Sequence, residues 1–212
     1  MNIKIISLTP RGEDCVAVTF LVSQGENEDF ETFVISRGRF RQMKLSTGEA
    51  TAGIYDEVSY YDKLHSACKT AMNLLAYGDR SRKKLVSKLR TKGIQSDIAE
   101  EAADELEARG YLNDTANATR EAERAVRKLW GKRRISASLY EKGYGEASVR
   151  KAIYALEDSE IDFVENCAKL ISEKYDLIPT DPKEKAKLFS AMTRYGYTSS
   201  EINSAIDKIK EA

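Results

Sequence analysis

The feature that most constrains the fold of this chain is a short pattern that recurs at intervals of 50 and 53 residues after residue 85. In each copy a large apolar residue stands four positions before a glycine, and another large apolar residue follows the glycine directly. The copies are Leu89-Gly93-Ile94, Leu139-Gly143-Tyr144 and Met192-Gly196-Tyr197. Glycine readily adopts the left-handed conformation that ends a helix, and the next apolar residue packs back against that helix. The pattern therefore predicts three helix ends.

An amphipathic helix is predicted after each of these glycines. Apolar residues recur with helical spacing in 98–106, 149–156 and 202–209. The glycines lie 50 and 53 residues apart, a spacing typical of stacked helical repeats. We therefore predict a mainly α protein in which three tandem three-helix modules form an elongated curved array. The predicted modules are 61–112, 113–158 and 159–212.

Residues 1–60 have the composition of β-strands instead. Runs rich in Val, Ile, Thr and Phe occur at 3–8, 15–22 and 33–35, and a polar turn precedes the last of them. These runs predict a small antiparallel β region of three strands ahead of the helical modules. From about Asp62 the apolar spacing becomes helical, so the first helix of the first module is expected to begin there.

The composition excludes several classes of protein. The chain has 34 basic and 34 acidic residues, and no apolar run approaches the roughly 18 to 20 residues of a membrane-spanning helix. Its start has no basic and apolar leader. Cys15, Cys68 and Cys167 are widely spaced and form no CxxC pair, which argues against a disulfide framework or a zinc site. We expect a soluble, cytoplasmic monomer that does not contact membranes.

Patterns that carry catalysis are missing from the sequence. His65 is the one histidine, and there is no Gly-rich phosphate loop, HExxH, GxSxG or Cys–His arrangement. We therefore expect no catalytic residues, no metal site and no cofactor. A protein of this kind acts by binding another macromolecule.

The first group of candidate binding residues is a basic run without an acid. It comprises Arg80, Arg82, Lys83, Lys84, Lys88, Arg90 and Lys92. Like charges one helical turn apart repel each other weakly, so this run would gain from an anionic partner. The alternative is a solvated helix that the next helix neutralises through its own acids, which are Asp97, Glu100, Glu101, Asp104, Glu105 and Glu107.

The second group is a basic stripe on one helix face together with the turn that follows it. The stripe comprises Arg120, Arg124, Arg127 and Lys128, and the turn adds Lys132, Arg133 and Arg134. Guanidinium groups bind carboxylates and phosphates alike, so the partner is either an acidic protein surface or DNA. The stripe could instead be solubilising surface. Trp130 beside it could anchor an interface, or it could be a partly buried residue at a helix end.

A further set of residues is predicted to have structural roles. Gly93, Gly143 and Gly196 end helices, and Gly110 is expected to do the same. Tyr111 and Leu112 are expected to pack one module onto the next, ahead of Asp114 at the start of another helix.

These segments resemble the RecX family. The similar strings are Arg80-Ser81-Arg82-Lys83-Lys84-Leu85 with Lys88-Leu89 and Lys92-Gly93-Ile94; Gly110-Tyr111-Leu112-Asn113-Asp114; Gly131-Lys132-Arg133-Arg134-Ile135 with Leu139 and Lys142-Gly143-Tyr144; and Lys187-Leu188 with Arg194-Tyr195-Gly196-Tyr197. The resemblance implies a regulator that lies in the groove of the RecA–DNA filament. It would suppress filament growth, ATP turnover and strand exchange there.

Two other functions stay open on the sequence alone. Three short helices with a basic middle helix are also typical of helix-turn-helix proteins that bind single- or double-stranded DNA by themselves, although zero net charge argues against this. The chain could also be a helical scaffold that binds neither RecA nor DNA.

Overall fold

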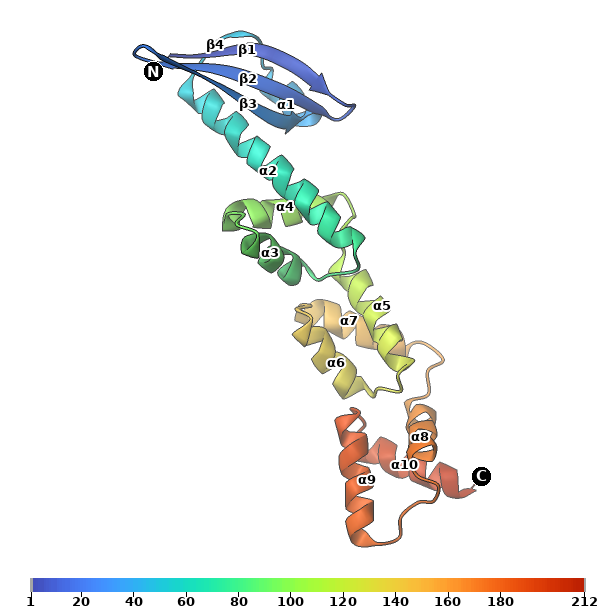
Figure 1. The fold of residues 1–212 in the computed structure, drawn as a ribbon. Helices are drawn as coiled ribbons and strands as arrows, with labels where there is room; N and C mark the ends of the chain where they lie inside the picture. Colours follow the sequence, from blue (N-terminus) through green and yellow to red (C-terminus); the bar gives the residue numbers. More distant parts are fainter. Residues whose placement is uncertain (1, 212) are drawn as a thin grey trace. The chain divides into compact units, whose positions relative to one another are not determined.

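The computed structural model describes residues 2–211, which form two compact units (Figure 1). The first unit combines the chain up to Gly78 with Leu85–Tyr111, and the second combines Asp79–Lys84 with the chain from Leu112 onward. The expected mainly α fold with a small antiparallel β region is confirmed. The three module boundaries and their array stay a prediction.

The first unit begins with an antiparallel sheet. Its strands are β1 (Asn2–Arg11), β2 (Cys15–Gln24), β3 (Asn27–Ser36) and β4 (Gly48–Ala50), in the order β3-β2-β1-β4. The three expected strands are therefore present. The short β4 was not expected, and it follows the helix α1 (Arg37–Met43) and pairs with β1.

One face of the sheet carries the first hydrophobic core. Ile5, Phe20 and Ile35 are buried there against Val58 of the helix α2. Because side chains alternate along a strand, Ile3 and Ile5 of β1 reach the same face as Phe20. Edge-to-face packing of Phe20 on Tyr55, with ring centres 5.3 Å apart, adds an aromatic contact between sheet and helix.

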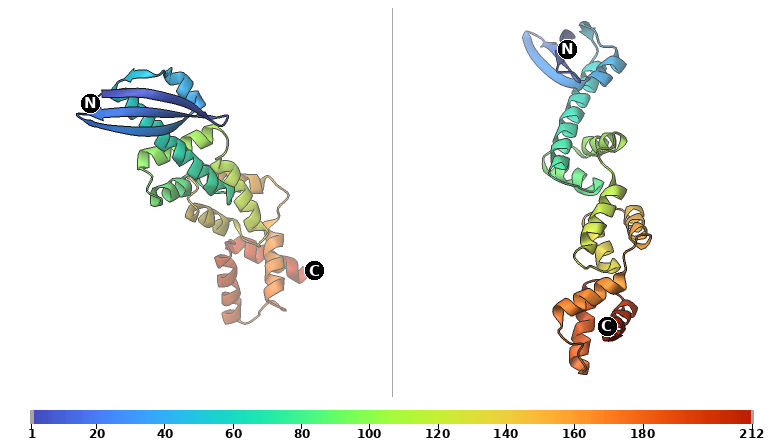
Figure 2. Two further views of the ribbon diagram at one scale, coloured as in Figure 1. Left: turned by 45° about the horizontal axis from the view of Figure 1, so that its top comes forward. Right: turned by 90° about the vertical axis from the view of Figure 1, so that its right-hand side faces the viewer.

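The helix α2 spans Ala52–Ala76, so the expectation that it begins near Asp62 was wrong. Its N-cap is Thr51, whose hydroxyl accepts a hydrogen bond from the Ile54 backbone N–H. Asp62 lies inside the helix, where its carboxylate accepts the Val34 N–H of β3 at 2.7 Å. The first half of α2 packs on the sheet and its second half on α4 (Figure 2).

Two shorter helices complete the first unit. They are α3 (Arg82–Thr91), whose residues from Leu85 onward belong to this unit, and α4 (Ser96–Ala108). Leu85 and Leu89 of α3 are fully buried, and Ala102 and Leu106 of α4 are buried as well. The apolar spacing read from the sequence is therefore the buried face of each helix.

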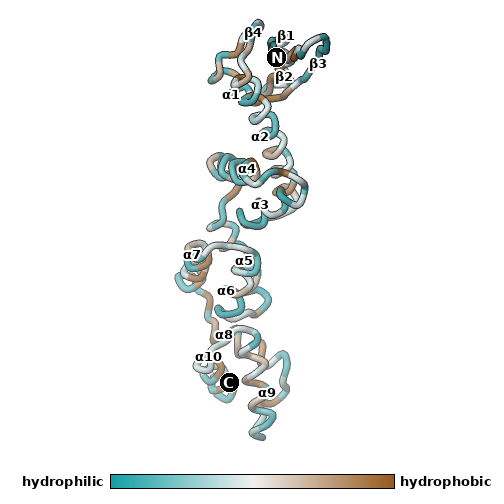
Figure 3. The backbone as a smooth tube through the Cα atoms, turned by 90° about the vertical axis from the view of Figure 1, so that its left-hand side faces the viewer, coloured by the Kyte–Doolittle hydropathy of each residue, from teal (hydrophilic) through white to brown (hydrophobic). Residues whose placement is uncertain are grey.

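The second unit contains six helices built around one hydrophobic core. They are α5 (Asp114–Val126), α6 (Lys132–Glu141), α7 (Glu146–Glu157), α8 (Phe163–Lys174), α9 (Pro182–Arg194) and α10 (Ser199–Glu211). The first and third helix of each triplet pack together, α5 on α7 and α8 on α10, as α2 does on α4 in the first unit. Figure 3 shows hydrophobic and hydrophilic residues alternating along these helices, which is the amphipathic pattern.

The three glycines end their helices as predicted. Gly93, Gly143 and Gly196 have φ of 86°, 84° and 96°. In each case the apolar residue after the glycine donates its N–H to the carbonyl five residues earlier, as Ile94 does to Leu89 at 3.2 Å. Gly110 ends α4 in the same way, with φ 77°.

Of the two residues after Gly110 that were expected to be packed, Tyr111 and Leu112, only Leu112 is buried. Leu112 is 1% exposed, whereas Tyr111 is 57% exposed, so the prediction for Tyr111 was wrong. The chain passes from Gly110 to the N-cap of α5 at Asn113, and in this short link the side chain of Leu112, not that of Tyr111, is the one that is buried.

Candidate partner-binding surfaces

The basic run on α3 leaves most of its charge on the surface. Leu85, Val86 and Leu89 are the buried residues of this helix. The candidate residues on its other faces are exposed, and in the described part of the chain their side chains form no ion pair; they are Lys83, Lys84, Lys88 and Arg90. Arg82 differs, because it is half-buried and its backbone N–H donates to the Asp114 carboxylate at 2.8 Å.

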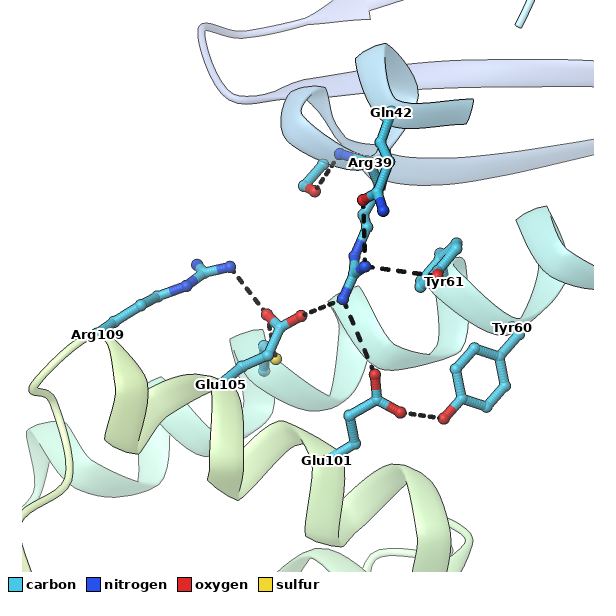
Figure 4. Close-up of polar contacts among 9 residues, drawn as sticks. Arg39, Gln42, Tyr60, Tyr61, Glu101, Glu105 and Arg109 are labelled. Atoms are coloured by element: carbon cyan, nitrogen blue, oxygen red, sulfur yellow. Dashed lines mark hydrogen bonds and ion pairs between the residues drawn. The ribbon is translucent and has the colours of Figure 1, made fainter. Parts of the chain in front are cut away.

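Glu101 and Glu105 of α4 lie beside a cation other than those of the basic run on α3, although both were among the acids expected to neutralise that run. Glu105 Oε1 lies 3.4 Å and Glu101 Oε1 4.0 Å from Nη2 of Arg39 on α1 (Figure 4). The Arg39 guanidinium also lies over the ring of Tyr61, 4.6 Å from its centre. Charge spacing along the chain cannot reveal this partner, because Arg39 lies 66 positions before Glu105.

The same cluster holds further polar contacts. Arg109 Nη2 lies 2.8 Å from Glu105 Oε2, and the hydroxyl of Tyr60 donates to Glu101. That hydrogen bond raises the pKa of Tyr60 to about 12. Glu101 and Glu105 therefore form the polar contacts that join α1, α2 and α4.

Half of the basic stripe on α5 is engaged within the second unit. Arg120 donates from Nε and Nη2 to the two carboxylate oxygens of Asp79, at 3.1 and 2.9 Å. Arg124 Nη2 lies 3.5 Å from the same carboxylate, and its Nη1 lies 3.1 Å from Glu121. The hydrogen bond from Arg120 lowers the pKa of Asp79. Sequence reasoning missed Asp79, which lies far from the stripe in the chain.

The turn after α5 is built around cations stacked on aromatic rings. The Arg134 guanidinium lies 4.0 Å from the Trp130 ring centre and 5.0 Å from that of Tyr195. Lys128 lies 5.5 Å from the Trp130 ring. Trp130 is partly buried against the core of the second unit. Its position therefore fits a partly buried residue at a helix end and not an exposed interface anchor. Arg134 stabilises this part of the core through its aromatic neighbours.

Lys132 also has partners of its own. Its Nζ lies 3.0 Å from Glu157 and 5.5 Å from the ring centre of Phe163. Arg127 and Arg133 are exposed and form no ion pair within the described residues. We call the exposed candidates that form neither an ion pair nor a ring contact within the described residues the unpaired cations; they are Lys83, Lys84, Lys88, Arg90, Lys92, Arg127 and Arg133.

Two of the predicted structural glycines make close contacts in the second unit. A Cβ on Gly143 would lie 2.9 Å from the Ser81 hydroxyl, and a Cβ on Gly196 would lie 2.4 Å from the backbone nitrogen of Arg134. Gly196 needs to be glycine because backbone atoms of Gly131 and Arg134 lie against it, and Gly143 because side chains at the start of α3 do. Asp114, as predicted, is at the start of α5.

The cysteines and the histidine do not assemble a metal site. Cys15 Sγ lies 3.6 Å from His65 Nε2, and Cys68 Sγ lies 3.7 Å from Glu105. Burial raises the pKa of the Cys68 thiol to about 11, which keeps it protonated at neutral pH. Residues 2–211 hold no group of three His, Cys, Asp or Glu that could bind a metal, and no helix among them is long and apolar enough to cross a membrane.

Comparisons with known proteins point to one family. The family model described as "RecX, first three-helix domain" matches residues 67–106. The "Regulatory protein RecX" of Xanthomonas axonopodis pv. citri (strain 306) is 29% identical over 144 residues, which cover 68% of this chain and 87% of that protein. The protein of the same name from Clostridioides difficile (strain 630) is 28% identical over 152 residues, 70% of each.

Solved structures share the fold. A crystal structure of regulatory protein RecX superposes with a TM-score of 0.74, at 18% identity, over 99% of this chain and 100% of that one. The crystal structure of RecX from Lactobacillus salivarius gives a TM-score of 0.64, at 21% identity, over 71% of this chain and 99% of that one.

Proposed function

Because this chain belongs to the RecX family of regulatory proteins, we propose that it binds the RecA–DNA filament and inhibits filament extension, ATP hydrolysis and strand exchange. It acts by binding and not by catalysis. The observation that carries the proposal is the set of unpaired cations on α3 and around α6, because they have no ion pairs in the described chain and are available to an anionic surface.

The chemistry of this set fits the surface of a nucleoprotein filament. Lys84 and Lys88 lie one turn apart on α3, and Lys83 and Arg90 flank them. Arginine and lysine bind acidic side chains and backbone phosphates, and a RecA–DNA filament offers both. These side chains have no partner charge in the described part of the folded chain and are exposed. At the edge of an interface with an anionic surface they stay largely solvated, so they mainly raise the rate of association.

The direct test is RecA ATP hydrolysis on single-stranded DNA with substoichiometric amounts of this chain. We expect hydrolysis to fall, and we expect a Lys84→Glu/Lys88→Glu variant to inhibit less. A suitable control is Lys151→Glu/Lys185→Glu, which makes the same charge change at exposed positions of α7 and α9. Hydrolysis that stays at its starting rate with the wild-type chain would remove the proposal.

The unpaired cations also favour a second candidate function, binding to DNA without RecA. Such binding would weaken steeply with salt, since each neutralised phosphate releases a counterion. The equal numbers of acidic and basic residues weigh against it. Fluorescence anisotropy of labelled DNA at several salt concentrations separates the two functions, because tight binding of DNA alone supports the second.

A further inference from the structure

In the second unit each glycine turn receives the beginning of another helix. The turn between α6 and α7 receives the start of α3. There the Ser81 hydroxyl donates to the Lys142 carbonyl at 2.6 Å, and the Arg82 N–H donates to the Asp114 carboxylate at 2.8 Å. We call such a glycine turn, together with the first helix of its three-helix group, a socket. For the turn between α6 and α7 that first helix is α5.

The turn between α9 and α10 forms a second filled socket. It receives the start of α6, where the Gly131 N–H donates to the Tyr195 carbonyl at 2.8 Å and the Arg133 N–H donates to the Gly196 carbonyl at 3.2 Å. A Cβ on Gly131 would lie 2.4 Å from the Gly196 carbonyl oxygen. Both filled sockets therefore take a helix start that has a small residue at its N-cap, Ser81 or Gly131.

The first unit contains the same turn, and its socket is open. A Cβ placed on Gly93 would meet nothing within 4 Å in the described chain, in contrast to Gly143 and Gly196. An open groove of about 650 Å³ lies here instead. Its lining comes from α2, from the turn and from α4, and includes Asp62, Lys63, Ser66, Thr70, Lys92 and Gly93.

The charged side chains of the open socket differ from those of the filled socket on α5. In the filled socket, Asp114 stands at the start of α5. Asp114 accepts a backbone N–H from the incoming helix. Lys63 can only donate, and Lys92 adds a second positive charge in the groove. Two cations therefore line the open socket beside Asp62, whose carboxylate already accepts the Val34 N–H, so the socket favours an occupant that brings carboxylates.

A second copy of the chain does not supply that occupant well. The remaining middle helix, α9, begins at Pro182, which has no N–H. Its N-cap Asp181 already accepts the N–H groups of Lys183 and Glu184, each at 3.0 Å. At the start of α9, the counterparts of the hydrogen-bond donors that bind in the other two sockets are therefore either absent or already hydrogen-bonded.

We infer that the groove at Gly93 binds the beginning of a helix from a partner protein, one with a small N-cap residue and an acidic first turn. Acidic residues are favourable in the first turn of a helix because of the helix dipole, and here they would meet Lys63 and Lys92. The incoming N-cap would lie on the open face of Gly93. This inference rests on the proposed function, which makes the RecA filament the partner to test.

The test uses two variants of the full chain and a matched control. Lys63→Glu reverses the charge in the groove, and Ser66→Trp fills it; both side chains are exposed. Lys69→Glu makes the same charge change at an exposed position of α2 outside the groove lining. We expect affinity for RecA filaments on single-stranded DNA, measured by anisotropy of labelled chain, to fall about tenfold or more in the first two variants and to stay unchanged in the third.

A photo-crosslinker at Thr70 identifies the occupant. We expect a cross-link to a RecA peptide at a helix start that carries Ser or Gly and an acid in its first turn. Full affinity of Lys63→Glu and Ser66→Trp would overturn the inference while leaving the proposed function intact, and so would a cross-link to DNA or to a second copy. If the wild-type chain fails to bind filaments, both proposals fall.

Discussion

Arg120 and Asp79 form a two-point ion pair that ties the start of the basic run to α5. Nε and Nη2 of Arg120 donate to the two carboxylate oxygens, at 3.1 and 2.9 Å. Both side chains are partly exposed, at 49% and 24%. Asp79→Asn should therefore lower the free energy of unfolding by only about 1 kcal/mol. Urea denaturation measures this, with Asp176→Asn as control, because Asp176 is exposed and forms no ion pair within the described residues.

The same pair predicts how stability depends on pH. Arg120 lowers the pKa of Asp79 in the folded state, so the ion pair stabilises the fold above the ordinary carboxyl pKa. That stabilisation is lost as the pH falls through the lowered pKa of the folded state. The difference in urea midpoint between wild type and Asp79→Asn should shrink toward acid pH. A difference that is constant from pH 7 to pH 3 would contradict the assignment.

Two arginines of the predicted binding group should respond differently to charge reversal. Arg120→Glu places a carboxylate against Asp79 and should destabilise the chain by about 1 to 2 kcal/mol. Arg133→Glu should not, because Arg133 is exposed in the first turn of α6, where a negative charge is favourable. Arg133→Glu should instead weaken inhibition of RecA ATP hydrolysis. Thermal unfolding and the ATPase assay, run on both variants, separate the structural from the binding role.

Leu89 should be a main contributor to the stability of the first unit. Its side chain is fully buried, and Leu89→Ala should cost about 2 to 5 kcal/mol. Leu177→Ala is the matched control, since that leucine is 85% exposed and its removal should change stability little. Equal unfolding midpoints of the two variants in urea would contradict the burial of Leu89.

The glycine turns offer a graded comparison. Gly110→Ala should cost about 1 kcal/mol, because alanine is strained at its positive φ but meets nothing within 4 Å. Gly196→Ala should cost about 1 to 3 kcal/mol more, because its Cβ would also lie 2.4 Å from the Arg134 nitrogen. The ranking can be read from thermal midpoints. If the two variants were equally stable, the contact between the Gly196 turn and the start of α6 would be in doubt.

The Arg39 cluster predicts a local effect on the contact of α1 with α4. Arg39→Ala removes the guanidinium from Glu101, Glu105 and the Tyr61 ring, and should cost about 1 to 2 kcal/mol. Arg41→Ala, an exposed arginine on the same helix, should have a smaller effect. Faster amide hydrogen exchange in α1 of Arg39→Ala, compared with Arg41→Ala, would locate the change.

The sequence alone determined those features that depend on neighbouring residues. Gly93, Gly143 and Gly196 end helices because a left-handed residue and the apolar residue after it form a local motif. The apolar faces around Leu89 and Leu106 follow from helical periodicity, and the strands from alternation. The start of α2 was missed because its first turns pack on the sheet, so the helical apolar spacing is regular only from about Asp62.

Only the tertiary structure decided which charges are available for binding. Asp79 pairs with Arg120 across 41 positions, and Arg39 with Glu105 across 66. Charge periodicity cannot predict such pairs, because it reports which side chains share a helix face and not what packs opposite that face. The open groove at Gly93 has the same origin. Its turn has the same local sequence motif as the two filled sockets, and only the packing shows that a Cβ on Gly93 would meet nothing within 4 Å in residues 2–211.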